Sequence, residues 1–66
     1  MNENQKIVYD WLVSTCRIES VGVAYAFQKL TEPDVEALHN FYKLTPLEKD
    51  EVLYKAIIEV DGEKVY

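Results

Sequence analysis

The sequence predicts a mainly helical fold, a small bundle of three to four short helices in one domain spanning residues 1–66. Two observations support this prediction. Helix-capping residues precede several segments, and apolar side chains recur within these segments at three- and four-residue spacing. The predicted helices cover residues 4–17, 21–30, 32–44 and 46–59. A chain of 66 residues has a length that suits a single domain.

The first predicted helix can begin at Asn2 or Asn4, because an asparagine side chain accepts a hydrogen bond from the free N–H groups of a first turn. Apolar and small residues share one side of it: Ile7, Val8, Trp11, Leu12, Thr15 and Cys16. This side is expected to face the core. Trp11 is also a candidate interface residue, because tryptophan is over-represented where proteins bind one another.

Residues 21–27 fit two interpretations. Alternate residues from Val21 to Phe27 are apolar, which is the period of two that is typical of a strand. A helix capped by Ser20 would equally place apolar side chains on one side. The alanines and the Gln-Lys-Leu end of the segment favour a helix, which we predict. The alternative fold is α+β, with a small antiparallel sheet from residues 21–27 and 57–66.

Thr31, Pro33 and Asp34 predict the start of the third helix, over residues 32–44. Threonine is a favoured N-cap, and an aspartate in the first turn interacts favourably with the partial positive charge of a helix N-terminus. One side of this helix is apolar and is expected to be buried: Val35, Ala37, Leu38, Phe41, Tyr42 and Leu44.

The last helix, residues 46–59, has the strongest start signal. The Thr45 hydroxyl can accept from the N–H of Glu48 while the Glu48 carboxylate accepts from the N–H of Thr45, and Pro46 suits the first helical position. Its apolar residues cover a broad arc: Val52, Leu53, Ala56, Ile57 and Val60, widened by Leu47, Tyr54 and Ile58. A helix that is apolar on most sides is either central in its core or contacts something outside its own chain.

The C-terminal end also fits two interpretations. Asp61-Gly62 is typical of a two-residue β-hairpin turn, which would place Ile58 opposite Val65. Alternatively, the last helix ends near Glu59 or Val60 and Gly62 lies close to its C-cap. We predict the helix, with a C-terminal hairpin as the second option.

Charge and composition exclude several classes of function. A net charge of −5, with seven scattered basic residues, argues against direct nucleic-acid binding. No apolar run is long enough for a membrane-spanning helix, no signal peptide is recognisable, and a single cysteine fits the reducing cytoplasm. Cys16 and His39 are too few for a structural zinc site and lack the third group that a catalytic pair needs. We therefore expect neither an enzyme nor a bound metal or cofactor.

The predicted function is a non-enzymatic protein-interaction or regulatory module. A chain this short buries only about 60% of its unfolded surface, yet its last helix is apolar on most sides. We expect an apolar-aromatic surface to bind a protein partner or a second copy in a homodimer. Its candidate residues are Leu47, Tyr54, Ile58 and Trp11. The alternative is an acidic inhibitor that mimics DNA and occupies a nucleic-acid-acting protein. In composition alone, the chain resembles small acidic accessory proteins of phages and prophages.

The last helix provides the first testable prediction. Thr45→Ala should lower the free energy of unfolding by about 1 kcal/mol, because an N–H group of the first turn loses its acceptor. Leu53→Ala should cost more, roughly 2–5 kcal/mol, if it opens a cavity in the core. Denaturant unfolding measures both variants. The reverse ranking would contradict the prediction that this helix is the core element.

Overall fold

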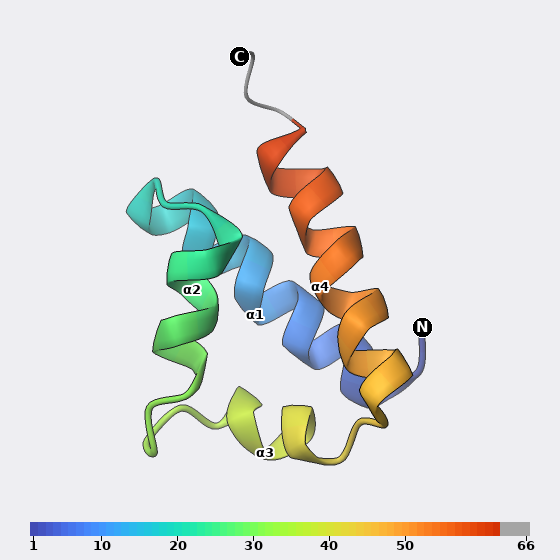
Figure 1. The fold of residues 1–66 in the computed structure, drawn as a ribbon. Helices are drawn as coiled ribbons and strands as arrows, with labels where there is room; N and C mark the ends of the chain where they lie inside the picture. Colours follow the sequence, from blue (N-terminus) through green and yellow to red (C-terminus); the bar gives the residue numbers. More distant parts are fainter. Residues whose placement is uncertain (63–66) are drawn as a thin grey trace.

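The computed structural model describes residues 1–62, and this part of the chain contains four helices and no strand. The helices are α1 (Glu3–Glu19), α2 (Val23–Leu30), α3 (Ala37–Tyr42) and α4 (Pro46–Asp61), as Figure 1 shows. The predicted mainly helical bundle is confirmed, and the ambiguous segment forms a helix from Val23 onward. The capping box predicted at Thr45 is also present.

The central element is α1, because each of the other three helices packs against it. In Figure 1, α2 and α4 flank α1, and the short α3 lies across the end of the bundle between them. The molecule is flat, with Cα extents of 34, 24 and 15 Å along its principal axes. The last helix is therefore not the centre of the core, although its sequence left that option open.

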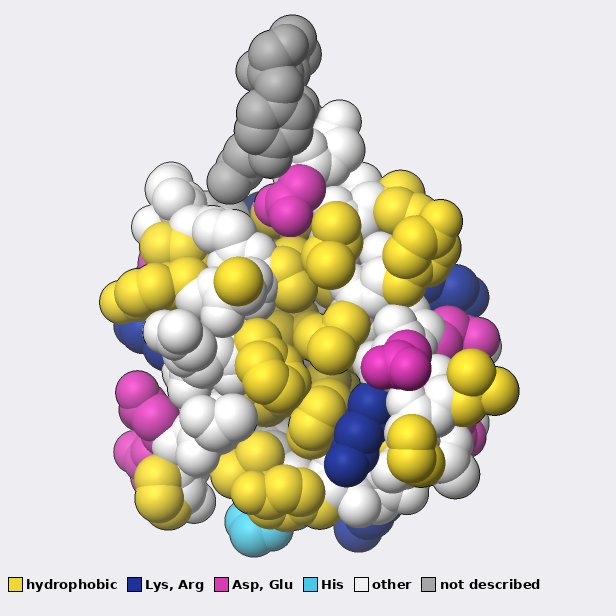
Figure 2. Space-filling model, viewed as in Figure 1, with side chains coloured by type: hydrophobic (Ala, Val, Ile, Leu, Met, Phe, Trp, Pro, Cys, Tyr) yellow, Lys and Arg dark blue, Asp and Glu magenta, His cyan; other side chains and the backbone are white. Residues whose placement is uncertain are grey.

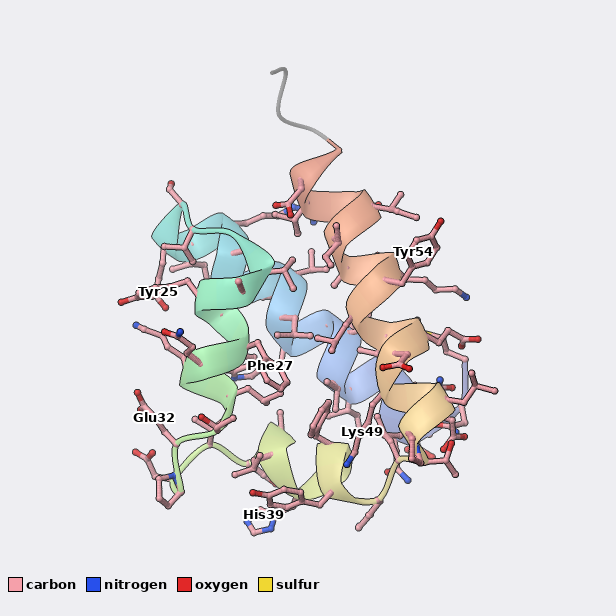
Figure 3. The ribbon with its side chains drawn as sticks, in the orientation of Figure 1. Tyr25, Phe27, Glu32, His39, Lys49 and Tyr54 are labelled. Carbon is pink, nitrogen blue, oxygen red and sulfur yellow. The ribbon has the colours of Figure 1, made fainter. Side chains whose placement is uncertain are left out.

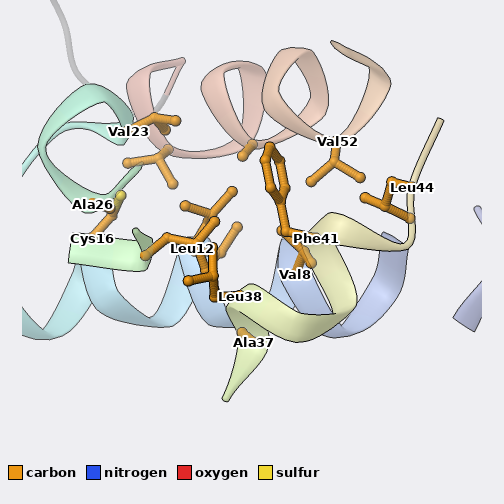
Figure 4. Close-up of a cluster of buried hydrophobic side chains, with 14 residues drawn as sticks. Val8, Leu12, Cys16, Val23, Ala26, Ala37, Leu38, Phe41, Leu44 and Val52 are labelled. Carbon is orange, nitrogen blue, oxygen red and sulfur yellow. The ribbon is translucent and has the colours of Figure 1, made fainter. Parts of the chain in front are cut away.

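The core is a cluster of buried apolar side chains contributed by all four helices and by Leu44, and Figure 4 shows it in close-up. Its members are Val8, Leu12, Val13, Cys16, Val23, Ala26, Leu30, Ala37, Leu38, Phe41, Leu44, Val52, Ala56 and Val60. Phe41 packs edge-to-face against Phe27, with ring centroids 5.4 Å apart. Leu53 is only half-buried at the margin of this cluster, so the cost of Leu53→Ala should fall at the low end of its range.

The helix predicted over residues 32–44 is shorter than expected, because Thr31 does not cap it. The Thr31 hydroxyl instead donates to the carbonyl oxygen of Gln28 at 2.7 Å, at the end of α2. Its backbone has helical dihedral angles, φ −78° and ψ 0°, whereas an N-cap residue has extended geometry. α3 therefore begins only at Ala37, after a turn, and Glu36 at its N-cap position makes no capping hydrogen bond with its side chain.

The start of α2 and the end of α4 also differ in detail from the predictions, whereas α2 ends at Leu30 as predicted. Ser20 does not cap α2: it ends α1 in the left-handed region, at φ 55°, and Gly22 occupies the N-cap position of α2. α4 continues to Asp61, and Gly62 is its C-cap residue as the helical interpretation required. Residues 57–61 of the optional hairpin thus lie in α4, and its second strand falls in residues 63–66, outside the described residues.

α1 and α4 run in the same direction and are held together at both ends. Near their C-termini, Arg17 Nη2 forms an ion pair with Glu59 Oε1 at 2.9 Å. Lys29 of α2 also donates to Glu19 near the end of α1, and this hydrogen bond is the main cause that raises the pKa of Lys29 above its ordinary value. These contacts are exposed to solvent, so they orient the helices relative to one another but contribute little to the free energy of unfolding.

The N-termini of α1 and α4 share a hydrogen-bonded joint built from two capping boxes. Asn2 and Gln5 form the first box, and Thr45 and Glu48 form the second. Asn2 Nδ2 donates to Glu48 Oε2 at 2.6 Å, which links the two boxes. The buried Gln5 side chain donates from Nε2 to the Glu48 carbonyl oxygen at 3.2 Å and to Glu51 Oε1 at 3.1 Å. The joint fixes which side of α4 faces α1.

Removing the Gln5 amide should therefore destabilise the fold. Gln5→Ala leaves the Asn2 N–H and two acceptors on α4 without their partner, and we expect a loss of about 1–3 kcal/mol in the free energy of unfolding. Gln28→Ala is the matched control, because the side chain of Gln28 is exposed on α2. Equal effects of the two substitutions in denaturant unfolding would contradict a structural role for the joint.

Candidate interaction surface

α4 has two apolar sides, and only one of them faces the core. Its buried residues, Val52, Ala56 and Val60, follow one another at four-residue spacing. Three large apolar side chains lie on the opposite side: Leu47, Tyr54 and Ile58, with exposed fractions of 79%, 65% and 54%. At 100° per residue these three fall within about 40° of one another and about 180° from Ala56. We call this set the α4 stripe.

The α4 stripe is directed away from the bundle. In Figure 3, Tyr54 points outward from α4, whereas Phe27 points into the space between α2 and α4. Leu47, Glu51, Tyr54 and Ile58 have the alternating spacing of four and three residues that is typical of a helix-packing seam. Three of these four positions are apolar, so the exposed side of α4 has the pattern of a side that packs against another helix.

The charges beside the stripe are arranged unevenly. Glu48 and Glu51 lie on the flank that faces α1, where their carboxylates accept hydrogen bonds from Asn2 and Gln5. Lys55 lies on the same flank one turn further along. The i, i+4 spacing of Glu51 and Lys55 favours an ion pair, but none of the ion pairs formed within residues 1–62 joins them.

Trp11 is not part of the α4 stripe. It belongs to α1, is half-buried and packs against the core cluster. Ile7 and Ile18 lie on the same side of α1 and are exposed, with exposed fractions of 40% and 82%. Ile7 was predicted to face the core, but this prediction is wrong, because the core side of α1 is formed by residues centred on Leu12. The helical period could have separated the two groups, because Ile7 and Leu12 project about 140° apart.

A second apolar area lies between α2 and α4. Figure 2 shows apolar side chains gathered along the middle of this face, with a lysine crossing the lower part. Figure 3 identifies Lys49 there, and its Nζ lies 5.0 Å from the centroid of the Phe41 ring. The ammonium group covers the face of this ring, a favourable cation–π contact. This area is thus the margin of the core, partly covered by the chain itself.

Outside the stripe, the reactive and metal-binding side chains of residues 1–62 do not cluster into a site. Cys16 is buried in α1, and His39 is exposed on α3. Residues 1–62 contain no group of three His, Cys, Asp or Glu side chains that could hold a metal ion, and they form no pocket. None of the helices in this part of the chain is long and apolar enough to span a membrane.

No protein-family model, curated protein or solved structure matches this chain. The fold and surface alone define its class: a small acidic helical bundle with an exposed apolar stripe on its last helix. The α4 stripe is therefore the candidate functional site.

The exposure of the stripe leads to a direct prediction. At concentrations where the chain is monomeric, Tyr54→Glu and Ile58→Glu should each change the free energy of unfolding by no more than about 0.5 kcal/mol, because surface substitutions remove little packing. Val52→Glu should prevent folding, because it buries an unpaired charge in the core. Circular dichroism and denaturant unfolding measure the three variants. Unfolding of the Tyr54 and Ile58 variants would show that these side chains belong to the core.

Proposed function

We propose that this protein is a non-enzymatic interaction module that binds a protein surface through the α4 stripe. The observation that supports the proposal is the position of Leu47, Tyr54 and Ile58 opposite the buried side of α4. Large side chains at these positions contribute little to folding within the chain. An apolar stripe of this kind on a small protein is typical of an interaction site.

The residue types in the stripe suit binding. Tyrosine gives a large, rigid contact area with a polar tip, and leucine and isoleucine add apolar area on either side of it. Tyr42 of α3 is equally exposed, at 66%, but it lies outside this stripe. Residues at the centre of a contact usually supply most of the binding energy, so we assign Tyr54 that role.

Acidic mimicry of DNA has less support. It requires carboxylates gathered on one face, whereas Asp10, Glu19 and Glu59 form ion pairs with basic side chains on three different parts of the surface. We also propose that the protein acts in the cytoplasm, since a chain with one cysteine suits a reducing compartment.

Site-specific photocrosslinking in cells that naturally produce the protein tests the proposal. A photoreactive phenylalanine derivative replaces Tyr54 in one variant and Tyr42 in the control, two tyrosines of nearly equal exposure. We expect a protein adduct from position 54 and none from position 42, and the adduct should disappear when Ile58→Glu is added. The absence of any adduct from position 54, or equal adducts from both positions, would refute the proposal.

A further inference from the structure

We propose that the α4 stripe binds a second copy of this chain, with the two α4 helices packed antiparallel about a twofold axis. This inference rests on the proposed function and names the partner. It is carried by the charges beside the stripe, which complement one another in this arrangement and not in a parallel one. Homodimers with twofold symmetry are the commonest oligomers.

Antiparallel packing first brings the apolar side chains of the two copies into contact. Leu47 and Ile58 lie at the two ends of the stripe, so a twofold axis midway between them sets Leu47 of one copy level with Ile58 of the other. Glu51 and Tyr54 of opposite copies come level in the same way. The tyrosine ring then packs beside the aliphatic part of the glutamate side chain, while its hydroxyl and the carboxylate remain at the margin in water.

The charges on one flank then complement each other. Glu48, Glu51 and Lys55 project roughly 40–100° to one side of the centre of the stripe, on the flank that faces α1. In a twofold antiparallel pair, equal flanks of the two copies meet. Lys55 of one copy comes level with position 50 of the other, between the levels of the Glu48 and Glu51 carboxylates. Symmetry forms this contact twice in each dimer.

The charged groups involved have no counter-ion within the described part of the chain. Lys55 is exposed, and none of the ion pairs in residues 1–62 includes it. Within residues 1–62, the Glu48 and Glu51 carboxylates accept hydrogen bonds only from uncharged donors: the side-chain amides of Asn2 and Gln5 and the backbone N–H of Thr45. Two negative charges beside an apolar stripe, followed one turn later by an unpaired positive charge, form a self-complementary surface.

A parallel pair would be opposed by the same charges. It sets opposite flanks against each other at equal levels, so Glu51 of one copy would lie beside Asp50 of the other, and Lys55 would lie beside Ile57. Like charges in contact disfavour an interface, and two parallel helices also align their dipoles unfavourably. The pattern of charge therefore selects the antiparallel arrangement.

Sedimentation equilibrium tests the self-association. The wild-type chain should form a reversible dimer at micromolar concentration, Tyr54→Glu should be a folded monomer, and Tyr42→Glu should dimerise like the wild type. Lys55→Glu sets carboxylates against carboxylates and should raise the dissociation constant by about tenfold or more. An equimolar mixture of Lys55→Glu and Glu51→Lys chains should associate more tightly than either variant alone, because opposite charges meet again.

Disulfide trapping tests the orientation. Chains carrying Leu47→Cys and chains carrying Ile58→Cys should crosslink to each other under mild oxidation, while each variant alone should crosslink much more slowly. Rapid crosslinking of Leu47→Cys chains with one another would overturn the antiparallel arrangement. A wild-type chain that stays monomeric at high micromolar concentration would overturn the second-copy proposal. The proposed function would survive that result if position 54 forms adducts with a different protein, and it would fail if position 54 forms none.

Discussion

The structure depends on the joint between the N-termini of α1 and α4. A glutamine side chain is buried there because its amide meets one donor and two acceptors, so burial leaves no polar atom unsatisfied. The joint sets two helices, far apart in the sequence, side by side and in the same direction. Once Gln5 holds Glu48 and Glu51 against α1, the rotation of α4 about its axis is fixed. The side that carries Val52 faces the core, and the side that carries Tyr54 faces outward.

The flatness of the molecule explains why so much of α4 remains exposed. With a short axis of only 15 Å between Cα atoms, the helices cannot surround α4. A fifth helix would be needed to cover its outer side, and residues 1–62 provide none. The apolar residues of α4 therefore divide into a core stripe of small and branched side chains and an outer stripe of larger ones. Small size alone accounts for an uncovered face, whereas the seam-like spacing of the outer residues points to packing against another helix.

The sequence predicted the features that are decided locally. Helix type and number, the Thr45 capping box and the C-cap at Gly62 depend on residues within one or two turns, and these predictions are confirmed. The predicted start of the third helix was wrong. The Thr31 hydroxyl could cap the following helix or bond to the preceding one, and it donates a hydrogen bond to the preceding one. The joint at Gln5 could not be predicted, since nothing near Gln5 in the sequence indicates that Glu48 lies beside it. The sequence showed that apolar residues cover a broad arc of α4. Which of these residues are buried in the core depends on that joint.

Two side chains of the joint border the candidate site. Glu48 and Glu51 hold the first turn of α1 in place, and the same two carboxylates border the α4 stripe. Binding at the stripe would stabilise the fold that contains this joint, because a ligand that binds only the folded state stabilises that state. In a chain this small, the outer side of α4 can therefore serve both association and the stability of the fold that presents it.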